Sequence, residues 1–283
     1  MARNVGILKA SGDYIVFVDS DDTVSPYLVQ RIKEVLRKSE YEIIAWKYAR
    51  KDHRGTELVD TAQFLRLYDD IETTGVEFLQ SILSGKMNSY VCTVAIKRSF
   101  VVKNNILFTP GAKYGEDLEF LYKCFLLANK VYFVNDYLYY YFINTDSVTN
   151  RPADLSILHL YGSTKRLVRF IKGIEKIKNI GEQKETLIRI FESKAYESLI
   201  FSVFRIYISN KVNNNIMLQI LSNNRIRNYF RNANLMYASR AVRLFRTFVL
   251  LFPPHLAIFL RPALRSFMKS LYRAYKKKKL VIP

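Results

Sequence analysis

Two groups of carboxylates have residue types and spacing that could do chemistry. In the first, Asp19, Asp21 and Asp22 directly follow an apolar run at residues 14–18. Carboxylates this close together repel one another and raise one another's pKa, so a fold that gathers them usually holds a cation there. Oxygen ligands alone favour a hard ion, Mg²⁺ or Mn²⁺. The alternative is a solvated acidic turn ahead of the next helix, which Ser25 is suited to cap.

The second group, Glu116 and Asp117, follows Gly115 and opens an apolar helix. Acidic residues in a first turn compensate the helix dipole, and this explanation requires no further function. The spacing alone therefore does not assign this pair to a site.

Alternating helix and strand patterns place both groups in an α/β domain. The run at 14–18 predicts a strand that delivers the first acids to its carboxyl end, where open α/β sheets bind ligands. Residues 2–10 have the apolar spacing of a helix, which Gly12 ends. Further helices are predicted at 25–38, 74–83, 99–104 and from 116, and further strands at 41–48, 90–97, 131–134 and 137–142, the last two around a turn at Asn135.

From residue 155 the pattern is all-helical, with a long helix at 183–208. A polar break at 144–152 precedes it and marks the expected domain boundary. We therefore divide the chain into an α/β domain at 1–150, a helical region at 151–235 and a basic amphipathic tail at 236–283.

The net charge of +19 is concentrated in the second half of the chain. Glu197 is the last acidic residue, and the 86 residues after it contain 16 Lys and Arg. The apolar run at 247–260 is too short to span a bilayer. Beyond it, apolar residues flanked by Lys and Arg recur at helical spacing: Leu264, Phe267, Met268, Leu271 and Tyr275. This pattern predicts a helix lying on an anionic membrane surface.

A basic chain with interleaved aromatic residues is also typical of a nucleic-acid-binding protein. Because the cations here follow an apolar stripe, they suit lipid headgroups better than phosphates in a groove, and we expect no nucleic acid partner. Cys92 and Cys124 lie in apolar patterns and indicate buried thiols of a cytoplasmic protein. No secretory leader is recognised at the first residues. His53, His159 and His255 are isolated, so we assign them to surface or core and not to a metal.

An ordered set of short motifs connects the two acidic groups. The set is Arg3-Asn4-x-Gly6, Gly12-Asp13-Tyr14-Ile15-x-Phe17-x-Asp19-Ser20-Asp21-Asp22, Gly115-Glu116-Asp117-x-Glu119-Phe120, Leu138-Tyr139-Tyr140-Tyr141 and Ser147-Val148-Thr149. In this order the motifs resemble the family 2 glycosyltransferases of the GT-A fold, from residue 2 to residue 149. The resemblance implies a GT-A-like, Rossmann-like sheet followed by an all-helical C-terminal region.

The resemblance also implies roles for the first acidic group. Asp19 and Asp21 match the Asp-x-Asp motif that holds a divalent metal, Mn²⁺ or Mg²⁺, and the diphosphate of a nucleotide-sugar. Asp22 beside them completes the expected metal set. Arg3 and Asn4 are expected to join Asp19 and Asp21 in binding the nucleotide-sugar.

For the second group, the resemblance implies that Asp117 is the catalytic base, with Glu116 beside it in the catalytic set. The implied reaction is the inverting, metal-dependent transfer of one sugar from a nucleoside-diphosphate sugar, foremost a UDP-sugar. The implied acceptor is a saccharide or a lipid-linked saccharide in bacterial surface polysaccharide synthesis. We expect the protein in the cytoplasm, peripheral at the inner face of the cell membrane.

Two features depart from the family pattern. The family begins with an apolar strand, typically ending in Pro-x-Tyr-Asn, that binds the nucleoside base, and this sequence lacks it. Phe142 stands where many relatives carry Arg after the tyrosine run. We therefore expect an N-terminally incomplete sheet. The alternative function is a catalytically inactive, truncated remnant that keeps its membrane association.

Overall fold

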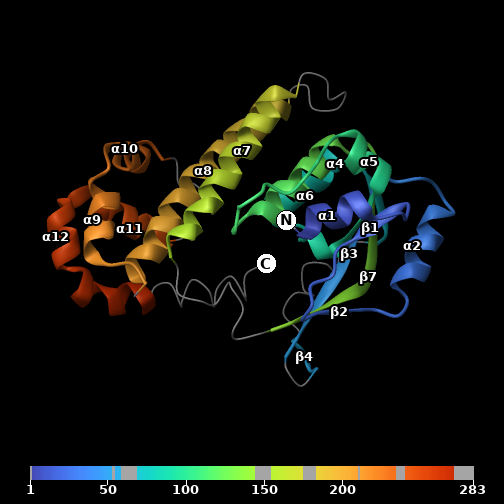
Figure 1. The fold of residues 1–283 in the computed structure, drawn as a ribbon, viewed down its shortest axis with the longest axis horizontal. Helices are drawn as coiled ribbons and strands as arrows, with labels where there is room; N and C mark the ends of the chain where they lie inside the picture. Colours follow the sequence, from blue (N-terminus) through green and yellow to red (C-terminus); the bar gives the residue numbers. More distant parts are fainter. Residues whose placement is uncertain are drawn as a thin grey trace.

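The computed structural model describes residues 2–52, 55–58, 69–143, 154–174, 183–209, 211–233 and 240–270. The described chain is elongated, with a sheet and its helices at one end and a lobe of shorter helices at the other (Figure 1). Two long helices, α7 (His159–Gly173) and α8 (Gln183–Ile208), run between them. The predicted boundary at 144–152 lies outside the described residues.

In the described part of the chain, seven strands form one mixed sheet. They are β1 (Tyr14–Val16), β2 (Thr23–Val24), β3 (Ile43–Lys51), β4 (Glu57–Leu58), β5 (Ile71–Thr73), β6 (Val94–Lys97) and β7 (Val131–Phe142). The order is β1-β6-β3-β7-β2, with β4 paired to β3 and β5 to β7. β3 and β7 are parallel, while β1 and β2 pair antiparallel at the two ends of this order.

Alternate residues of β3 supply two cores on opposite faces of the sheet. Ile43 and Ala45 belong to the larger core, and Ile44 and Trp46 to the smaller one. The larger core packs under α1 (Ala2–Lys9), α4 (Gly75–Leu83), α5 (Arg98–Lys103) and α6 (Glu116–Leu127), and the smaller one under α2 (Leu28–Leu36). Because successive side chains of a strand point to opposite faces, a strand segment covered on both sides is apolar at consecutive positions, as Ile43–Trp46 of β3 are.

The predicted capping box at the start of α4 is confirmed. The Thr74 hydroxyl accepts a hydrogen bond from the Glu77 amide at 3.3 Å, and the Glu77 carboxylate accepts one from the Thr74 amide at 3.0 Å. At Gly75 an added Cβ would lie 2.1 Å from the carbonyl oxygen of Phe125. Glycine is therefore required for the start of α4 to pack against the end of α6.

The start of α2 differs from the prediction. The helix begins at Leu28 after Tyr27, and no side chain caps its first turn. The Ser25 hydroxyl accepts a hydrogen bond from the Tyr27 amide at 3.3 Å, and the Ser25 amide donates to the carbonyl of Leu138 at 3.0 Å. The predicted capping role of Ser25 is wrong because this residue is tied to β7 before the helix begins.

The two strands predicted at 131–134 and 137–142 are one strand. β7 continues through Asn135, where the sequence predicted a turn. Trp46 of β3 pairs with Val134, and the next residue, Lys47, pairs with Tyr137. The register shift accommodates Asn135 and Asp136 as extra residues of β7 within the sheet. These two polar residues are therefore an irregularity in the strand and do not end it.

The predicted strand at 90–97 is a strand only in its second half. Residues Val91–Thr93 form a short 3₁₀ helix ahead of β6. The Thr93 hydroxyl donates to the carbonyl of Tyr90 at 3.0 Å and accepts from the amide of Tyr90 at 2.9 Å. This local pairing of side chain and backbone competes with strand formation.

The described chain is helical from residue 155, as predicted. The elements after α8 are α9 (Asn214–Ser222), α10 (Asn224–Asn232), α11 (Arg240–Leu251), α12 (Pro254–Phe259) and a further helical run at 261–270. α8 has the predicted bounds and belongs to both ends of the molecule. Leu187 and Phe191 pack into the larger core of the sheet, whereas Phe204 and Tyr207 pack into the core of the helical lobe.

The amphipathic stripe predicted for the tail is partly buried. Met268 is 5% exposed inside the lobe core, and Leu264 packs against that core. Phe267 is 58% exposed, and Leu271 and Tyr275 lie outside the described residues. The prediction that this stripe faces a membrane is therefore wrong for Met268. In the described parts of the chain, every helix is too short or too polar to cross a membrane.

A buried arginine closes the lobe core. The Arg261 side chain, in a residue only 1% exposed, donates to the carbonyl oxygens of Tyr207 at 2.8 Å and Ser209 at 3.0 Å, beside the C-terminal end of α8. It also donates to the carbonyl of Val212 at 3.0 Å and the side-chain oxygen of Asn214 at 2.8 Å. Carbonyls at a helix C-terminus carry partial negative charge, which stabilises the guanidinium.

Candidate active site

The first acidic group lies in a tight turn after β1. β1 ends at Val16, so the acids follow a short connection and do not extend a long strand. The Asp22 amide donates to the Asp19 carbonyl at 3.1 Å, which closes the turn. Asp21 is exposed at its tip, and the Asp19 side chain is 44% exposed. The two carboxylates of the predicted Asp-x-Asp motif are thus accessible to a ligand.

Asp22 points the other way, into the protein, and is 9% exposed. Its carboxylate accepts a hydrogen bond from the Tyr139 hydroxyl at 2.6 Å and one from the Phe142 amide at 2.9 Å. Burial raises the pKa of Asp22, although the hydrogen bonds from Tyr139 and Phe142 oppose the shift. Because both oxygens have partners on β7, Asp22 anchors the turn to the sheet. Its predicted place among the metal ligands stays a prediction.

Arg3 joins the two acidic groups. From α1 its guanidinium contacts the Asp19 carboxylate at 3.1 Å and the Glu116 carboxylate at 3.5 Å. The same guanidinium lies 5.4 Å from the ring centre of Phe108. Figure 1 shows α1 beside β1, the strand that leads to the Asp19 turn. Two motifs that are far apart in the sequence therefore meet at one corner of the sheet.

Asn4 is engaged elsewhere. Its side-chain amide donates to the carbonyl of Phe108 at 2.9 Å, and its side-chain oxygen accepts from the Phe108 amide at 2.9 Å. A paired interaction of this kind fixes the loop before α6 against α1. Asn4 therefore positions the loop, and the contact with a nucleotide-sugar that the sequence predicted stays a prediction.

Glu116 and Asp117 lie in the first turn of α6, as predicted. Burial raises the pKa of Glu116, the Asp117 charge adds to the shift and Arg3 opposes it. One Asp117 oxygen accepts a hydrogen bond from the Leu118 amide at 2.8 Å. The turn before the helix depends on Gly115, whose φ is +76° and whose added Cβ would lie 3.0 Å from Leu160. Glycine at this position holds the two acids where α6 meets α7.

Glu119 is a structural residue to which the sequence assigned no role. It is 3% exposed, and its carboxylate accepts hydrogen bonds from Arg166 Nε at 2.9 Å, Lys123 at 2.7 Å and the Thr109 hydroxyl at 3.0 Å. Burial raises the pKa of Glu119, but the hydrogen bonds from Arg166 and Lys123 outweigh it and lower the pKa overall. Glu119 lies inside the Gly-Glu-Asp-x-Glu motif, two positions after Asp117. Its place in the motif was the signal in the sequence that could have indicated a role for it.

A cavity of about 640 Å³ lies beside this turn, between α4, α6, α7 and α8. Its walls include Leu118 and Tyr122 of α6, and Phe191 and Phe201 of α8. Burial raises the pKa of Tyr122 to about 12, and a nearby negative charge on Asp117 contributes to the shift. Asp117 lies in the same turn as Gly115 and Leu118, which both line this cavity.

The acids after β1 suit a metal ion only together with a second ligand. Within the described ranges, no three or more His, Cys, Asp and Glu side chains are arranged to hold an ion. Proteins usually bind Mg²⁺ through one or two carboxylates together with substrate phosphates and water, not through a complete protein cage. Asp19 and Asp21 supply two accessible carboxylates. They fit an ion that binds together with a diphosphate.

Comparisons with known proteins match the part of the chain that contains the Asp19 turn. The family model for glycosyl transferase family 2 matches residues 1–96, which include α1, β1 and the Asp19 turn. In this N-terminal part, the chain is similar to the family 2 glycosyltransferases. The uncharacterized glycosyltransferase EpsJ of Bacillus subtilis is 31% identical over 152 residues, which are 53% of this chain and 44% of EpsJ. The poly(ribitol-phosphate) beta-glucosyltransferase of Bacillus spizizenii is 26% identical over 170 residues, which are 60% of this chain and 25% of that enzyme.

The fold of the chain is found in a solved structure as well. The crystal structure of S. aureus TarS 1-349 in complex with UDP-GlcNAc matches with a TM-score of 0.55 and 17% identity, over 93% of this chain and 71% of that one. This likeness confirms the predicted GT-A-like sheet with a helical C-terminal region. The chain spans less than two thirds of the length of the two curated relatives named above.

Proposed function

We propose that the protein transfers a single sugar, with inversion, from a nucleoside-diphosphate sugar to the hydroxyl of a saccharide or lipid-linked saccharide in bacterial surface polysaccharide synthesis. The observation that carries the proposal is the contact of Arg3 with both Asp19 and Glu116. This contact brings the acidic turn proposed for the diphosphate into one corner with Glu116, the residue next to the candidate base Asp117, as a direct displacement between donor and acceptor requires.

The donor binds at the Asp19 turn in this proposal. Asp19 and Asp21 hold Mn²⁺ or Mg²⁺ with the diphosphate, and Arg3 is placed to pair with the phosphate oxygens. The ion, when bound, acts as a Lewis acid that offsets the charge developing on the departing diphosphate. A UDP-sugar is the preferred donor because a protein of the same fold has been crystallised with UDP-GlcNAc.

The acceptor binds in the cavity beside α6. Asp117 removes the proton of the acceptor hydroxyl while that oxygen attacks the anomeric carbon. The new bond joins the acceptor oxygen to the sugar, and the bond between the sugar and the diphosphate breaks with its electron pair on the diphosphate. The proton remains on Asp117 until solvent takes it. Glu116, held by Arg3, positions the Asp19 turn against α6.

Calorimetry of the full chain tests the donor site. We expect UDP and UDP-GlcNAc to bind only with Mn²⁺ or Mg²⁺, and Asp21→Asn to weaken that binding at least about tenfold, or 1.4 kcal/mol. The matched control is Asp13→Asn, because Asp13 is an exposed carboxylate at the opposite end of β1. Equal binding by wild type and Asp21→Asn, or equal binding with EDTA, would contradict the proposal and favour the inactive remnant.

A further inference from the structure

The lobe has an apolar helix face that points away from its core. The helix continues across the end of α12, because the Leu260 amide donates to the Leu256 carbonyl at 2.9 Å and the Leu264 amide to the Leu260 carbonyl at 3.0 Å. Positions four apart therefore lie on one face. Phe259 is 79% exposed and Phe267 58% exposed, and they are eight positions apart on this run.

The exposed residues between the two rings carry no charge. They are Pro262, Ala263 and Ser266. The opposite side of the run is buried, with Ala257 and Arg261 each 1% exposed. We call Phe259, Pro262, Ala263, Ser266 and Phe267 the outer face. Single exposed apolar residues are ordinary on protein surfaces, but two aromatic rings on one uncharged face form a contiguous patch.

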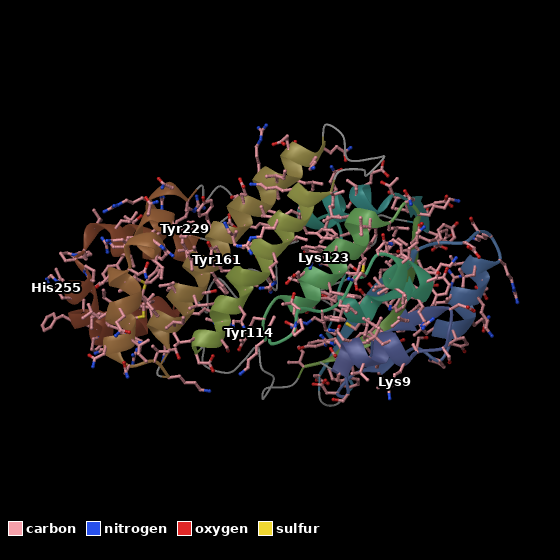
Figure 2. All side chains as sticks on the ribbon, turned by 45° about the horizontal axis from the view of Figure 1, so that its top comes forward. Lys9, Tyr114, Lys123, Tyr161, Tyr229 and His255 are labelled. Carbon is pink, nitrogen blue, oxygen red and sulfur yellow. The ribbon has the colours of Figure 1, made fainter. Side chains whose placement is uncertain are left out.

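The part of the chain that carries the outer face has cations and no acids. The sequence has no acidic residue after Glu197, and α10 and α11 expose Arg225, Arg231, Arg240 and Arg243. α10, α11 and α12 form the end of the molecule that lies away from the sheet (Figure 1). Figure 2 shows His255 of α12 at this end and Lys9 of α1 near the other. The exposed arginines of α10 and α11 and the outer face therefore lie at the same end of the molecule.

We propose that the outer face docks on an anionic lipid bilayer. The rings of Phe259 and Phe267 enter the boundary between headgroups and acyl chains, and the arginines of α10 and α11 pair with anionic headgroups around them. A bilayer offers an apolar interior beneath a negative surface, which matches this arrangement. A nucleic acid would instead require cations at the centre of the contact, and the outer face has none. This surface is independent of the glycosyl-transfer site.

Sedimentation of the full chain with vesicles tests the docking surface. We expect binding to phosphatidylcholine vesicles that contain phosphatidylglycerol, weaker binding to phosphatidylcholine alone, and weakening as salt rises. The Phe259→Ser/Phe267→Ser variant should bind roughly 10- to 100-fold more weakly, since two aromatic side chains lose their apolar contact. The matched control is Val29→Ser/Val102→Ser, because these valines are 62% and 49% exposed on α2 and α5 of the sheet domain.

Both double variants change exposed side chains, so each should melt within a few degrees of wild type, as circular dichroism will report. Wild-type affinity in the Phe259→Ser/Phe267→Ser variant would overturn the outer face as the docking surface. If the chain binds neutral vesicles as tightly as anionic ones at all salt concentrations, the proposed pairing of arginines with anionic headgroups is overturned. If the wild-type chain binds neither kind of vesicle but binds RNA, the membrane proposal is overturned and the partner is a nucleic acid.

Discussion

The sheet domain and the helical lobe stabilise buried charge in different ways. In the sheet domain, Glu119 is paired with Arg166 and Lys123 of opposite charge. In the lobe, Arg261 is held by backbone carbonyls and the Asn214 side chain. A buried ion needs compensation from a partner or from hydrogen bonds. The lobe uses the end of a helix because its sequence offers no carboxylate after Glu197.

This difference separates two tasks along the molecule. The sheet domain gathers Asp19, Asp21, Glu116 and Asp117 near one corner, where a single cation, Arg3, contacts two of them. The lobe has cations without acids and an exposed apolar face. We infer that chemistry is confined to one end of the chain and surface attachment to the other, with α7 and α8 between them.

The largest expected effect comes from the corner of the sheet domain. Asp117→Asn should keep donor binding and reduce sugar transfer by about 10²–10⁴-fold, because the amide preserves the shape of the side chain but cannot accept a proton. The rate of sugar transfer is measured as the transfer of labelled sugar from UDP-sugars to a membrane extract. Asp13→Asn is again the control. If Asp117→Asn transfers sugar at the wild-type rate, Asp117 only compensates the dipole of α6, and the base lies elsewhere.

The next effect tests how the lobe holds its buried cation. Arg261→Met should destabilise the protein by about 3–5 kcal/mol, because several buried carbonyls lose their donor. Urea unfolding followed by circular dichroism gives the free energy. Arg243→Met, at an exposed position of α11, should change it by no more than about 0.5 kcal/mol. Similar losses in the two variants would mean that the carbonyl contacts of Arg261 contribute little.

The smallest effect tests the ion pair of the sheet domain. Glu119→Gln should cost about 1.5–3 kcal/mol at pH 7, because the hydrogen bonds from Arg166 and Lys123 lose their charge assistance. Glu119 has a lowered pKa, so its contribution is present above the pKa of the unfolded chain, about 4.3. It is lost as pH falls through the lower pKa of the folded state.

Unfolding of wild type and Glu119→Gln at several pH values checks this sign. The stability difference between the two proteins should shrink as pH falls below about 4, near the reference pKa of glutamate. A difference that stays constant down to pH 2 would show that the charge of Glu119 does not contribute, and that only its hydrogen bonds matter.

Some features were determined by the sequence alone. The bounds of α8 follow from its apolar pattern, and the start of α4 follows from the spacing of Thr74 and Glu77. The order of the acidic motifs was by itself enough to indicate the family. The helix bounds depend on residues within a few positions of one another, where helical periodicity and capping act. A short window of sequence therefore contains the information that they need.

Other features were decided only by the tertiary structure. The three acids after β1 look alike in sequence, yet Asp22 turns inward because Tyr139, 117 positions away, donates to its carboxylate. In the tail, the spacing predicted one apolar stripe, but within it Met268 is buried while Phe267 is exposed. Periodicity shows that a helix has an apolar face. Which side of the helix is covered depends on the elements that pack against it, and those come from distant parts of the chain.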